Sequence, residues 1–225
     1  MNQPNRIEIK ERAKKLIKGN IWNLLKPWLI AYVIELVVAI INTFFFTKSV
    51  ACPLDMPFAT RCTEATAMST LVQIVLSLAS IVFIFGFIRY VLKFARGEQY
   101  SVKEDLFYYF KNDLGAVLLT GILTSILITA WSLLLVIPGI IAAISYSMVF
   151  YLKVDTDKTG MDLIDESKKM MQGHKADYFV FVLSFFGWAI LGGLTFGLAY
   201  IYVIPYISVS QALYYEEIKK INSNN

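Results

Sequence analysis

The stretch LGAVLLTGILTSILITAWSLLLVIPGIIAAISYSMVFYL, residues 114–152, runs for 39 positions without a charged side chain. A helix that spans a membrane needs about 20 apolar residues at about 1.5 Å per residue. As one straight helix this stretch would be roughly 58 Å long, nearly twice the thickness of the hydrocarbon core. It therefore predicts a helical hairpin, that is, two membrane spans joined by a tight turn.

Three further runs carry little or no charge. Residues 178–215 form a charge-free run of 38 positions, which predicts a second hairpin of the same kind. Residues 65–88 hold no charge and residues 27–47 hold only Glu35, so each of these runs predicts a single span. Together the runs predict an all-α polytopic membrane protein with six transmembrane helices arranged as three hairpins.

The composition agrees with that prediction. Of the 225 residues, 57% are hydrophobic and only 17% are charged, and the mean hydropathy is +0.58. A typical soluble domain has roughly 45–50% apolar and about 25% charged residues, so too little charge remains here to cover a water-soluble globule. The same numbers exclude an intrinsically disordered or fibrous chain.

The positive charges lie on one side of the predicted spans. Nineteen of the 21 Lys and Arg residues precede the first span, lie between the second and third or the fourth and fifth, or follow the sixth. Only Lys48 and Arg61 fall elsewhere. This positive-inside bias predicts a multi-pass protein of the bacterial plasma membrane with both termini in the cytoplasm. The formal charge of +4 is thus a topology signal and does not indicate nucleic-acid binding.

Glycine and proline mark the turns of the two long runs. In the last run Gly192-Gly193 and Gly197 bracket the expected turn, which places Pro205 inside the sixth span. In the run quoted first, the spacing between repeats places the turn near residues 129–132, and its proline then lies inside the fourth span. The alternative places this turn at residues 136–139, since proline is tolerated in either setting.

The cytoplasmic segments repeat one pattern three times. Each begins with a helix N-cap and an acid three residues on, continues with apolar residues at helical spacing, and ends at a residue that tolerates the left-handed conformation. The three N-caps are Asn5, Ser101 and Thr159, and the three end residues are Gly19, Asn112 and Gly173. The repeated unit is a helix followed by a hairpin, and the units cover approximately residues 5–95, 101–153 and 159–220 of a single integral membrane domain, 1–225.

The three cytoplasmic helices are expected to be amphipathic and to lie at the membrane interface. They can bind anionic lipid headgroups or a membrane-protein partner. The alternative is that they merely seat the following span at the headgroups. The lipid bilayer is the partner that the sequence indicates, and no cofactor or metal is expected.

Glu35 is the one charged residue near the middle of a predicted span. An ionised acid costs roughly 2.5–3.5 kcal/mol at that depth, so Glu35 should face protein or water rather than lipid. One hypothesis makes it a proton- or cation-linked site, and the alternative is a protonated acid that is hydrogen-bonded between helices. The neutral intramembrane partners considered for it are Gln73, Ser145, Ser147, Ser208, Ser210 and Gln211.

Cys52 and Cys62 lie in the one sizeable external loop, residues 48–68. Because disulfides persist outside the cytoplasm, we predict a bridge between them. From chain entropy alone such a bridge would stabilise the loop by about 2–3 kcal/mol. Two thiols without a histidine or a further cysteine do not predict a metal site.

Catalytic motifs are absent from the sequence. It contains no phosphate-binding glycine loop, no HExxH motif and no Ser-His-Asp set. His174, the single histidine, follows a helix-ending glycine in a cytoplasmic turn and is expected to be a solvated cap residue. An enzyme is therefore not expected.

Several longer motifs occur together in this chain. The most extended is Trp131-Ser-Leu-Leu-Leu-Val-Ile-Pro-Gly-Ile140, which is followed by Ser145-Tyr-Ser-Met148. Further pieces are Ala13-Lys-Lys-Leu-Ile-Lys-Gly19, Arg96-Gly-Glu98, Asp105-Leu-Phe107, Glu166-Ser-Lys-Lys-Met170 and Tyr214-Tyr215-Glu216. The set resembles a bacterial family of integral membrane proteins catalogued as domain of unknown function 975. The resemblance implies a fold and a membrane location, and it brings no catalytic or binding residue with it.

The sequence thus favours a non-enzymatic envelope or accessory protein that interacts with lipid or with a membrane partner. The alternative is a small transporter or channel that uses Glu35 and the serine-containing fourth and sixth spans. These two hypotheses differ in whether solutes cross the membrane through the protein.

Overall fold

The computed structural model describes residues 3–50 and 62–223 of the chain. Its helices are α1 (Arg6–Ile17), α2 (Ile21–Phe46), α3 (Ala67–Arg96), α4 (Val102–Leu106), α5 (Tyr108–Lys111), α6 (Leu114–Leu134), α7 (Val136–Ser145), α8 (Val149–Asp155), α9 (Met161–Met170), α10 (Lys175–Leu183), α11 (Phe186–Leu194) and α12 (Tyr200–Ser223). A two-stranded antiparallel ribbon, β1 (Thr47–Val50) and β2 (Cys62–Ala65), extends from the ends of α2 and α3.

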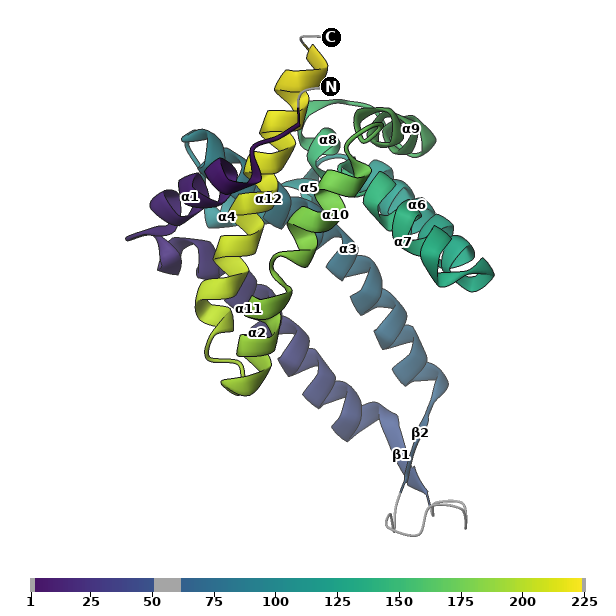
Figure 1. Cartoon of the computed structure of the whole chain (residues 1–225). Coiled ribbons are helices and arrows are strands. Elements are labelled where there is room, and N and C mark those ends of the chain that lie inside the picture. Colours follow the sequence, from purple (N-terminus) through teal and green to yellow (C-terminus); the bar gives the residue numbers. More distant parts are fainter. Residues whose placement is uncertain (1–2, 51–61, 224–225) are drawn as a thin grey trace.

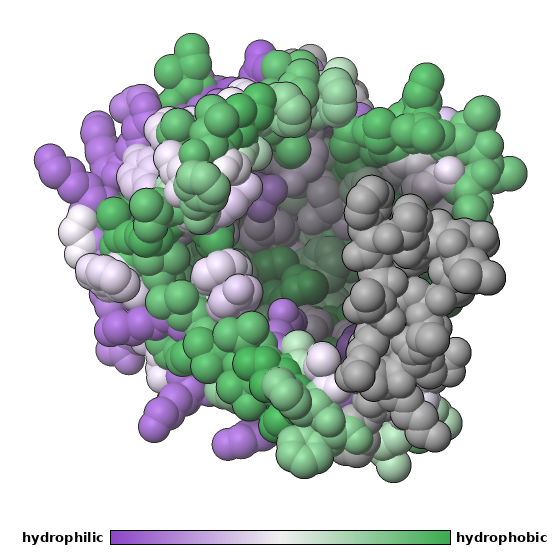
Figure 2. Space-filling model, turned by 90° about the horizontal axis from the view of Figure 1, so that it is seen from below, coloured by the Kyte–Doolittle hydropathy of each residue, from purple (hydrophilic) through white to green (hydrophobic). Residues whose placement is uncertain are grey.

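Three helical hairpins diverge from one end of the molecule (Figure 1). The first consists of α2 and α3, the second of α6 with α7 and α8, and the third of α10 and α11 with α12. The start of α1 and the end of α12 lie at the end where the hairpins meet, together with α4, α5 and α9, and we call this end the head. Seen from the opposite end, the molecule is hollowed between the hairpins, and apolar side chains surround the hollow (Figure 2).

The short head helices pack in a cyclic order. The helix α4 packs on α3 and α9 packs on α8, so each lies against the last helix of the preceding hairpin. The ring is closed by α1, which packs on α12. On α1 the residues Ile9, Ala13 and Ile17 are at most 1% exposed. Burial of this apolar face holds the two ends of the chain together.

Side-chain caps fix the starts of α1 and α3. The side chain of Asn5 accepts a hydrogen bond from the backbone N–H of Glu8 at 3.3 Å, as the sequence predicted. The hydroxyl of Thr66 accepts a bond from the N–H of Ser69 at 3.2 Å. Such bonds satisfy donors that have no partner within the helix. The long helix α3 then ends at Gly97, whose φ of 74° most other residues would adopt only with strain.

The segment of α7 and α8 is interrupted between Ser145 and Val149. The interruption frees backbone groups from the helix, and Ser167 of α9 binds two of them. Its hydroxyl donates to the carbonyl oxygen of Ser145 at 2.8 Å and accepts from the N–H of Met148 at 3.3 Å. Since an unpaired backbone group is costly away from water, Ser167 stabilises the interruption and also fixes α9 against it.

Five segments within the described residues are long and apolar enough to cross a membrane. They are Ile21–Phe45, Ala67–Arg96, Leu114–Leu134, Val136–Asp155 and Lys175–Leu194. The helix α12 is not among them. These segments support the helical membrane protein that the sequence predicted, and the short β1–β2 ribbon is an addition to it.

The turn of the second hairpin differs from the favoured prediction. A turn near residues 129–132 is wrong, because α6 continues to Leu134 and the chain becomes extended at Leu135. The alternative at residues 136–139 is closer. Pro138 lies in the first turn of α7, where the N–H that proline lacks would have no helical partner. The third hairpin turns between α11 and α12, as its glycines predicted, and its proline lies inside α12.

One predicted head-helix boundary is also wrong, and at another the boundary is correct but the left-handed residue is not. Asn112 has an ordinary φ of −127°, and the left-handed residue is Asp113 with φ of 57°, a conformation that aspartate tolerates better than most residues. Thr159 is not the N-cap of α9, because Gly160 takes that place with φ of 56°. The N–H of Gly160 donates to the hydroxyl of Thr120 in α6 at 2.8 Å, so a tertiary contact sets this boundary.

Gly86 allows α4 to approach α3 closely. A Cβ atom at this position would lie 2.2 Å from the carbonyl oxygen of Leu106 in α4. We therefore expect Gly86→Ala to destabilise the protein by about 1–3 kcal/mol, measured as a lower apparent melting temperature in detergent. The control is Gly115→Ala in α6, where a Cβ would meet no atom within 4 Å. A Gly86→Ala variant that melts like wild type would contradict the docking of α4 on α3.

Candidate functional site

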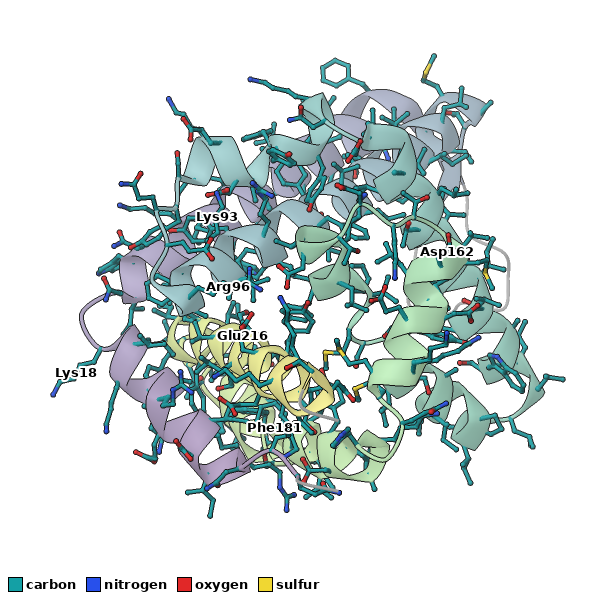
Figure 3. The ribbon with its side chains drawn as sticks, turned by 90° about the horizontal axis from the view of Figure 1, so that it is seen from above. Lys18, Lys93, Arg96, Asp162, Phe181 and Glu216 are labelled. Carbon is teal, nitrogen blue, oxygen red and sulfur yellow. The ribbon has the colours of Figure 1, made fainter. Side chains whose placement is uncertain are left out.

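Arg96 joins the last helices of the three hairpins at the head. It ends α3, and its guanidinium lies 2.7 Å from a carboxylate oxygen of Asp155 in α8 and 2.6 Å from one of Glu216 in α12. Figure 3, seen from above, shows Arg96 and Glu216 next to each other at the head. The side chains of Asp155 and Glu216 are only 10% and 22% exposed, so solvent screens these ion pairs weakly.

Asp155 receives two further contacts from α12. The hydroxyl of Tyr215 donates to Oδ2 of Asp155 at 2.8 Å, and Nζ of Lys219 lies 2.6 Å from the same atom. The ring of Tyr215 also stacks on that of Tyr151 in α8, with the ring centroids 5.2 Å apart. We use the name head junction for Arg96, Asp155 and Glu216 together with Tyr151, Tyr215 and Lys219. Its charges pair with one another across three helices, which is the arrangement of a structural contact.

A second ion cluster fixes α4 to α3. Asp105 is 2% exposed, and its Oδ1 accepts from Nζ of Lys93 at 2.6 Å and from Nε of Arg89 at 3.2 Å. Its Oδ2 accepts the backbone N–H of Ser101 at 2.8 Å. The hydroxyl of Ser101 makes no capping bond. The capping pattern predicted that Glu104 would accept the backbone N–H of Ser101, and Asp105 accepts it instead.

A small polar cavity of about 130 Å³ lies at the head between α3, α5 and the end of α8. Lys153 in its wall is 4% exposed, and its Nζ lies 3.6 Å from Oδ2 of Asp113 and donates to the carbonyl oxygen of Lys158 at 3.3 Å. Burial raises the pKa of Tyr109 in the same wall to about 12. The phenol of Tyr109 donates to the carbonyl oxygen of Lys153 at 3.5 Å.

An open cavity of about 520 Å³ lies between the second hairpin and the helices α9 and α10, and we call it the lysine cavity. The residues that line it are Leu127, Trp131, Pro138, Ile141, Ala142, Ser145, Tyr146, Lys168, Gln172 and Lys175. Nζ of Lys168 lies 3.0 Å from Asp165 and 5.6 Å from the centroid of the Tyr146 ring. Lys175 forms no ion pair with any residue that the structure describes. The cavity thus combines a long apolar wall with positive charge at its head end.

Glu35 lies in the wall of a different cavity, of about 280 Å³, between α2 and α3. The hydroxyl of Ser80 donates to Oε1 of Glu35 at 2.8 Å. Across the described part of the chain, Glu35 has no Lys or Arg as an ion-pair partner. Aromatic side chains make up much of the remaining wall: Trp28 and Tyr32 from α2, and Phe83 and Phe87 from α3. We call this the Glu35 cavity.

The other polar candidates do not gather around Glu35. The hydroxyl groups of Ser145 and Ser210 donate to carbonyl oxygens of their own helices, and that of Ser147, between α7 and α8, donates to the carbonyl oxygen of Ile144. Gln211 lines a separate apolar cavity between α10, α11 and α12. Gln73 is an exposed residue of α3, and Ser208 is a half-buried residue of α12. Ser80, which the sequence reasoning did not single out, is the residue that bonds to Glu35.

The predicted disulfide lies outside what the structure tests. Cys52 is not among the described residues, and of Cys62 only the backbone is described, in β2. The bridge therefore stays a prediction. Among the described residues, no group of three or more His, Cys, Asp or Glu side chains could hold a metal ion.

His174 is not the solvated residue that the sequence predicted. Its exposed fraction is only 2%, immediately before α10. The turn at residues 171–174 lies against the core, where Met171 and Tyr178 are 0% and 5% exposed, so the imidazole is covered. Its Nδ1 atom has no hydrogen-bond partner among the described residues.

The pairing of Glu35 with Ser80 follows from the register of the first hairpin, which the structure provides and the sequence does not. The ribbon pairs Thr47 with Ala65, and Glu35 lies 12 positions before the first of these residues while Ser80 lies 15 after the second. Residues at similar distances from an antiparallel turn lie at similar depth. No comparable signal predicts the lysine cavity, because α6 and α7 belong to one repeat unit and α9 and α10 to the next.

From the contacts of the head junction we expect the folded protein to lose stability when the guanidinium of Arg96 is replaced by a neutral group. Arg96→Gln would leave Asp155 and Glu216 short of a positive charge, at a cost of about 2–3 kcal/mol because the groups are partly rather than fully buried. The measurement is the free energy of unfolding in detergent. The control is Lys220→Gln, which removes only an exposed contact to Glu217 within α12 and should change nothing. Equal stability of both variants would show that the junction does not hold the hairpins together.

Comparison with known proteins finds similarity at the level of a family alone. No curated protein and no solved structure matches the chain. Residues 128–222, from the end of α6 into the last turns of α12, match the family described as "Protein of unknown function (DUF975)". The match contains the motif that starts at Trp131, whereas the similar pieces near Ala13 and Arg96 lie before it. Over residues 128–222 the chain is therefore similar to the DUF975 family that its motifs predicted.

Proposed function

We propose that this chain is a six-span, non-enzymatic protein of the bacterial plasma membrane that binds anionic phospholipid at its cytoplasmic face. The observation that carries the proposal is the lysine cavity, an apolar wall that ends in Lys168 and Lys175. The family match adds no activity, since the family itself is described as of unknown function.

The membrane topology follows from charge and from the shape of the molecule. In this proposal α12 is the sixth span, because it returns antiparallel to α11 and residues 178–215 carry no charge. The head is then the cytoplasmic side, because 19 of the 21 Lys and Arg residues lie in segments that the hairpins leave at that end. Both termini are cytoplasmic in this arrangement.

The lysine cavity fits a phospholipid by length and by charge. From Pro138 to Tyr146 its wall follows α7 for about 12 Å, at 1.5 Å per residue, alongside Leu127 and Trp131 of α6. An acyl chain can lie along this wall while the headgroup meets Lys168 and Lys175. Lysines at the cytoplasmic interface favour anionic over zwitterionic lipid by about 1 kcal/mol each. The exposed apolar spans are also compatible with a membrane-protein partner. No feature of the described residues indicates which protein that partner would be.

The lipid proposal predicts that two lysines control selectivity. Replacing both in Lys168→Gln/Lys175→Gln should weaken binding of phosphatidylglycerol about tenfold or more and leave phosphatidylcholine unaffected. The measurement is native mass spectrometry of the full chain titrated with each lipid. The matched control is Lys103→Gln/Lys111→Gln, which removes the same charge from the head outside the cavity. If both double variants lose phosphatidylglycerol binding equally, the effect comes from general surface charge and the proposal is wrong.

A second candidate function is a small transporter or channel with Glu35 as its proton- or cation-linked site. The observation that favours it is the hydrogen bond from Ser80 to Glu35 inside a cavity at the depth of the spans. In proteoliposomes this function predicts a flux of protons or cations through wild type that Glu35→Gln abolishes. Wild-type vesicles as impermeable as protein-free ones would rule it out, and they would leave the lipid proposal intact.

A further inference from the structure

The Glu35 cavity brings a carboxylate, a hydroxyl group and aromatic rings together inside the first hairpin. Glu35 lies near the middle of α2, and Ser80 meets it from α3 at 2.8 Å. Trp28 and Tyr32 stack in parallel in the same wall, with centroids 5.4 Å apart and an angle of 6° between the rings. Phe83 contributes a further ring from α3.

The carboxylate in this cavity is short of partners. Among the described residues its one hydrogen bond comes from a neutral hydroxyl group, and it forms no ion pair with any of them. An ionised acid at the depth of a span is stable only when it is paired or solvated. A positively charged ligand would therefore gain more binding free energy in this cavity than a neutral ligand.

The chemistry of the wall distinguishes between kinds of cation. Small hard cations such as Mg²⁺ and Ca²⁺ require several oxygen ligands, and the cavity offers the carboxylate of Glu35 and the hydroxyl of Ser80. Aromatic faces instead attract organic cations, above all quaternary ammonium groups. Rings around a single carboxylate thus favour an organic cation with an apolar body.

We propose that the Glu35 cavity binds a hydrophobic organic cation, of the quaternary ammonium class, whose charge pairs with Glu35 and lies against Trp28 and Tyr32. Ser80 fixes one carboxylate oxygen and leaves the other for the ligand. Leu106 of α4 borders the cavity on the side of the head. The site is separate from the lysine cavity and does not depend on it. It shares Glu35 with the transporter candidate, but it requires binding and no flux.

The test is equilibrium binding of benzyltrimethylammonium to the full chain in lipid nanodiscs. Glu35→Gln should weaken binding of this cation at least tenfold, because the variant keeps the shape of the side chain and removes its charge. Neopentylbenzene, in which carbon replaces the nitrogen, should bind wild type and Glu35→Gln equally, which separates charge recognition from partition into lipid. Ser80→Ala should weaken cation binding about threefold. Its matched control is Ser77→Ala, one turn away on α3, whose hydroxyl only binds the carbonyl of Ile74.

Binding of the cation that is absent in wild type, or equal in wild type and Glu35→Gln, would overturn the proposal. Each variant is first compared with wild type in melting temperature and in size-exclusion profile. If Glu35→Gln does not fold, Trp28→Leu replaces it, with an expected loss of at least fivefold for the cation and a smaller one for neopentylbenzene. A bound cation without any flux in proteoliposomes would contradict the transporter candidate and leave this site standing.

Discussion

The ion pairs of Arg96 are the contact on which the arrangement of the hairpins depends. The three hairpins diverge from the head, and the hollow between them shows how little protein fills the space away from it (Figure 2). In four of the five apolar segments only 17–22% of the most apolar window is buried within the molecule. Packing along the spans therefore cannot by itself set their relative positions. At the head, one guanidinium contacts α8 and α12 from the end of α3, and the cyclic packing of α4, α9 and α1 surrounds that contact.

The head helices also explain how an interrupted helix persists in this fold. Away from water, every backbone N–H and carbonyl group that leaves a helix needs another partner. Ser167 provides that partner between α7 and α8, and the hydroxyl of Thr120 does the same for Gly160 at the start of α9. In both cases a helix of one repeat unit completes the backbone bonds of another. The second and third units are thus coupled by hydrogen bonds as well as by apolar burial.

The coarse fold could be predicted because it follows from one-dimensional quantities. The length of a charge-free run determines whether it holds one helix or two, and the Asn5 cap is a contact within four residues. The errors occur where the decision is tertiary. Asp105 takes the place of the capping acid predicted at Glu104 because Lys93 and Arg89 stand beside it on α3. His174 is covered because a turn folds back on the core, which no local pattern encodes.

The same distinction applies to the candidate sites. Glu35 stands out in the sequence because an ionised side chain is rare at that depth. Its partner Ser80 follows from hairpin register, which is a local property of one repeat unit. Lys168 and Lys175 look like ordinary interfacial lysines until α9 and α10 of one unit are placed beside α6 and α7 of another. Both cavities are open because neighbouring helices diverge from the head. The feature that leaves the spans poorly packed against each other is therefore the feature that creates room for a ligand between them.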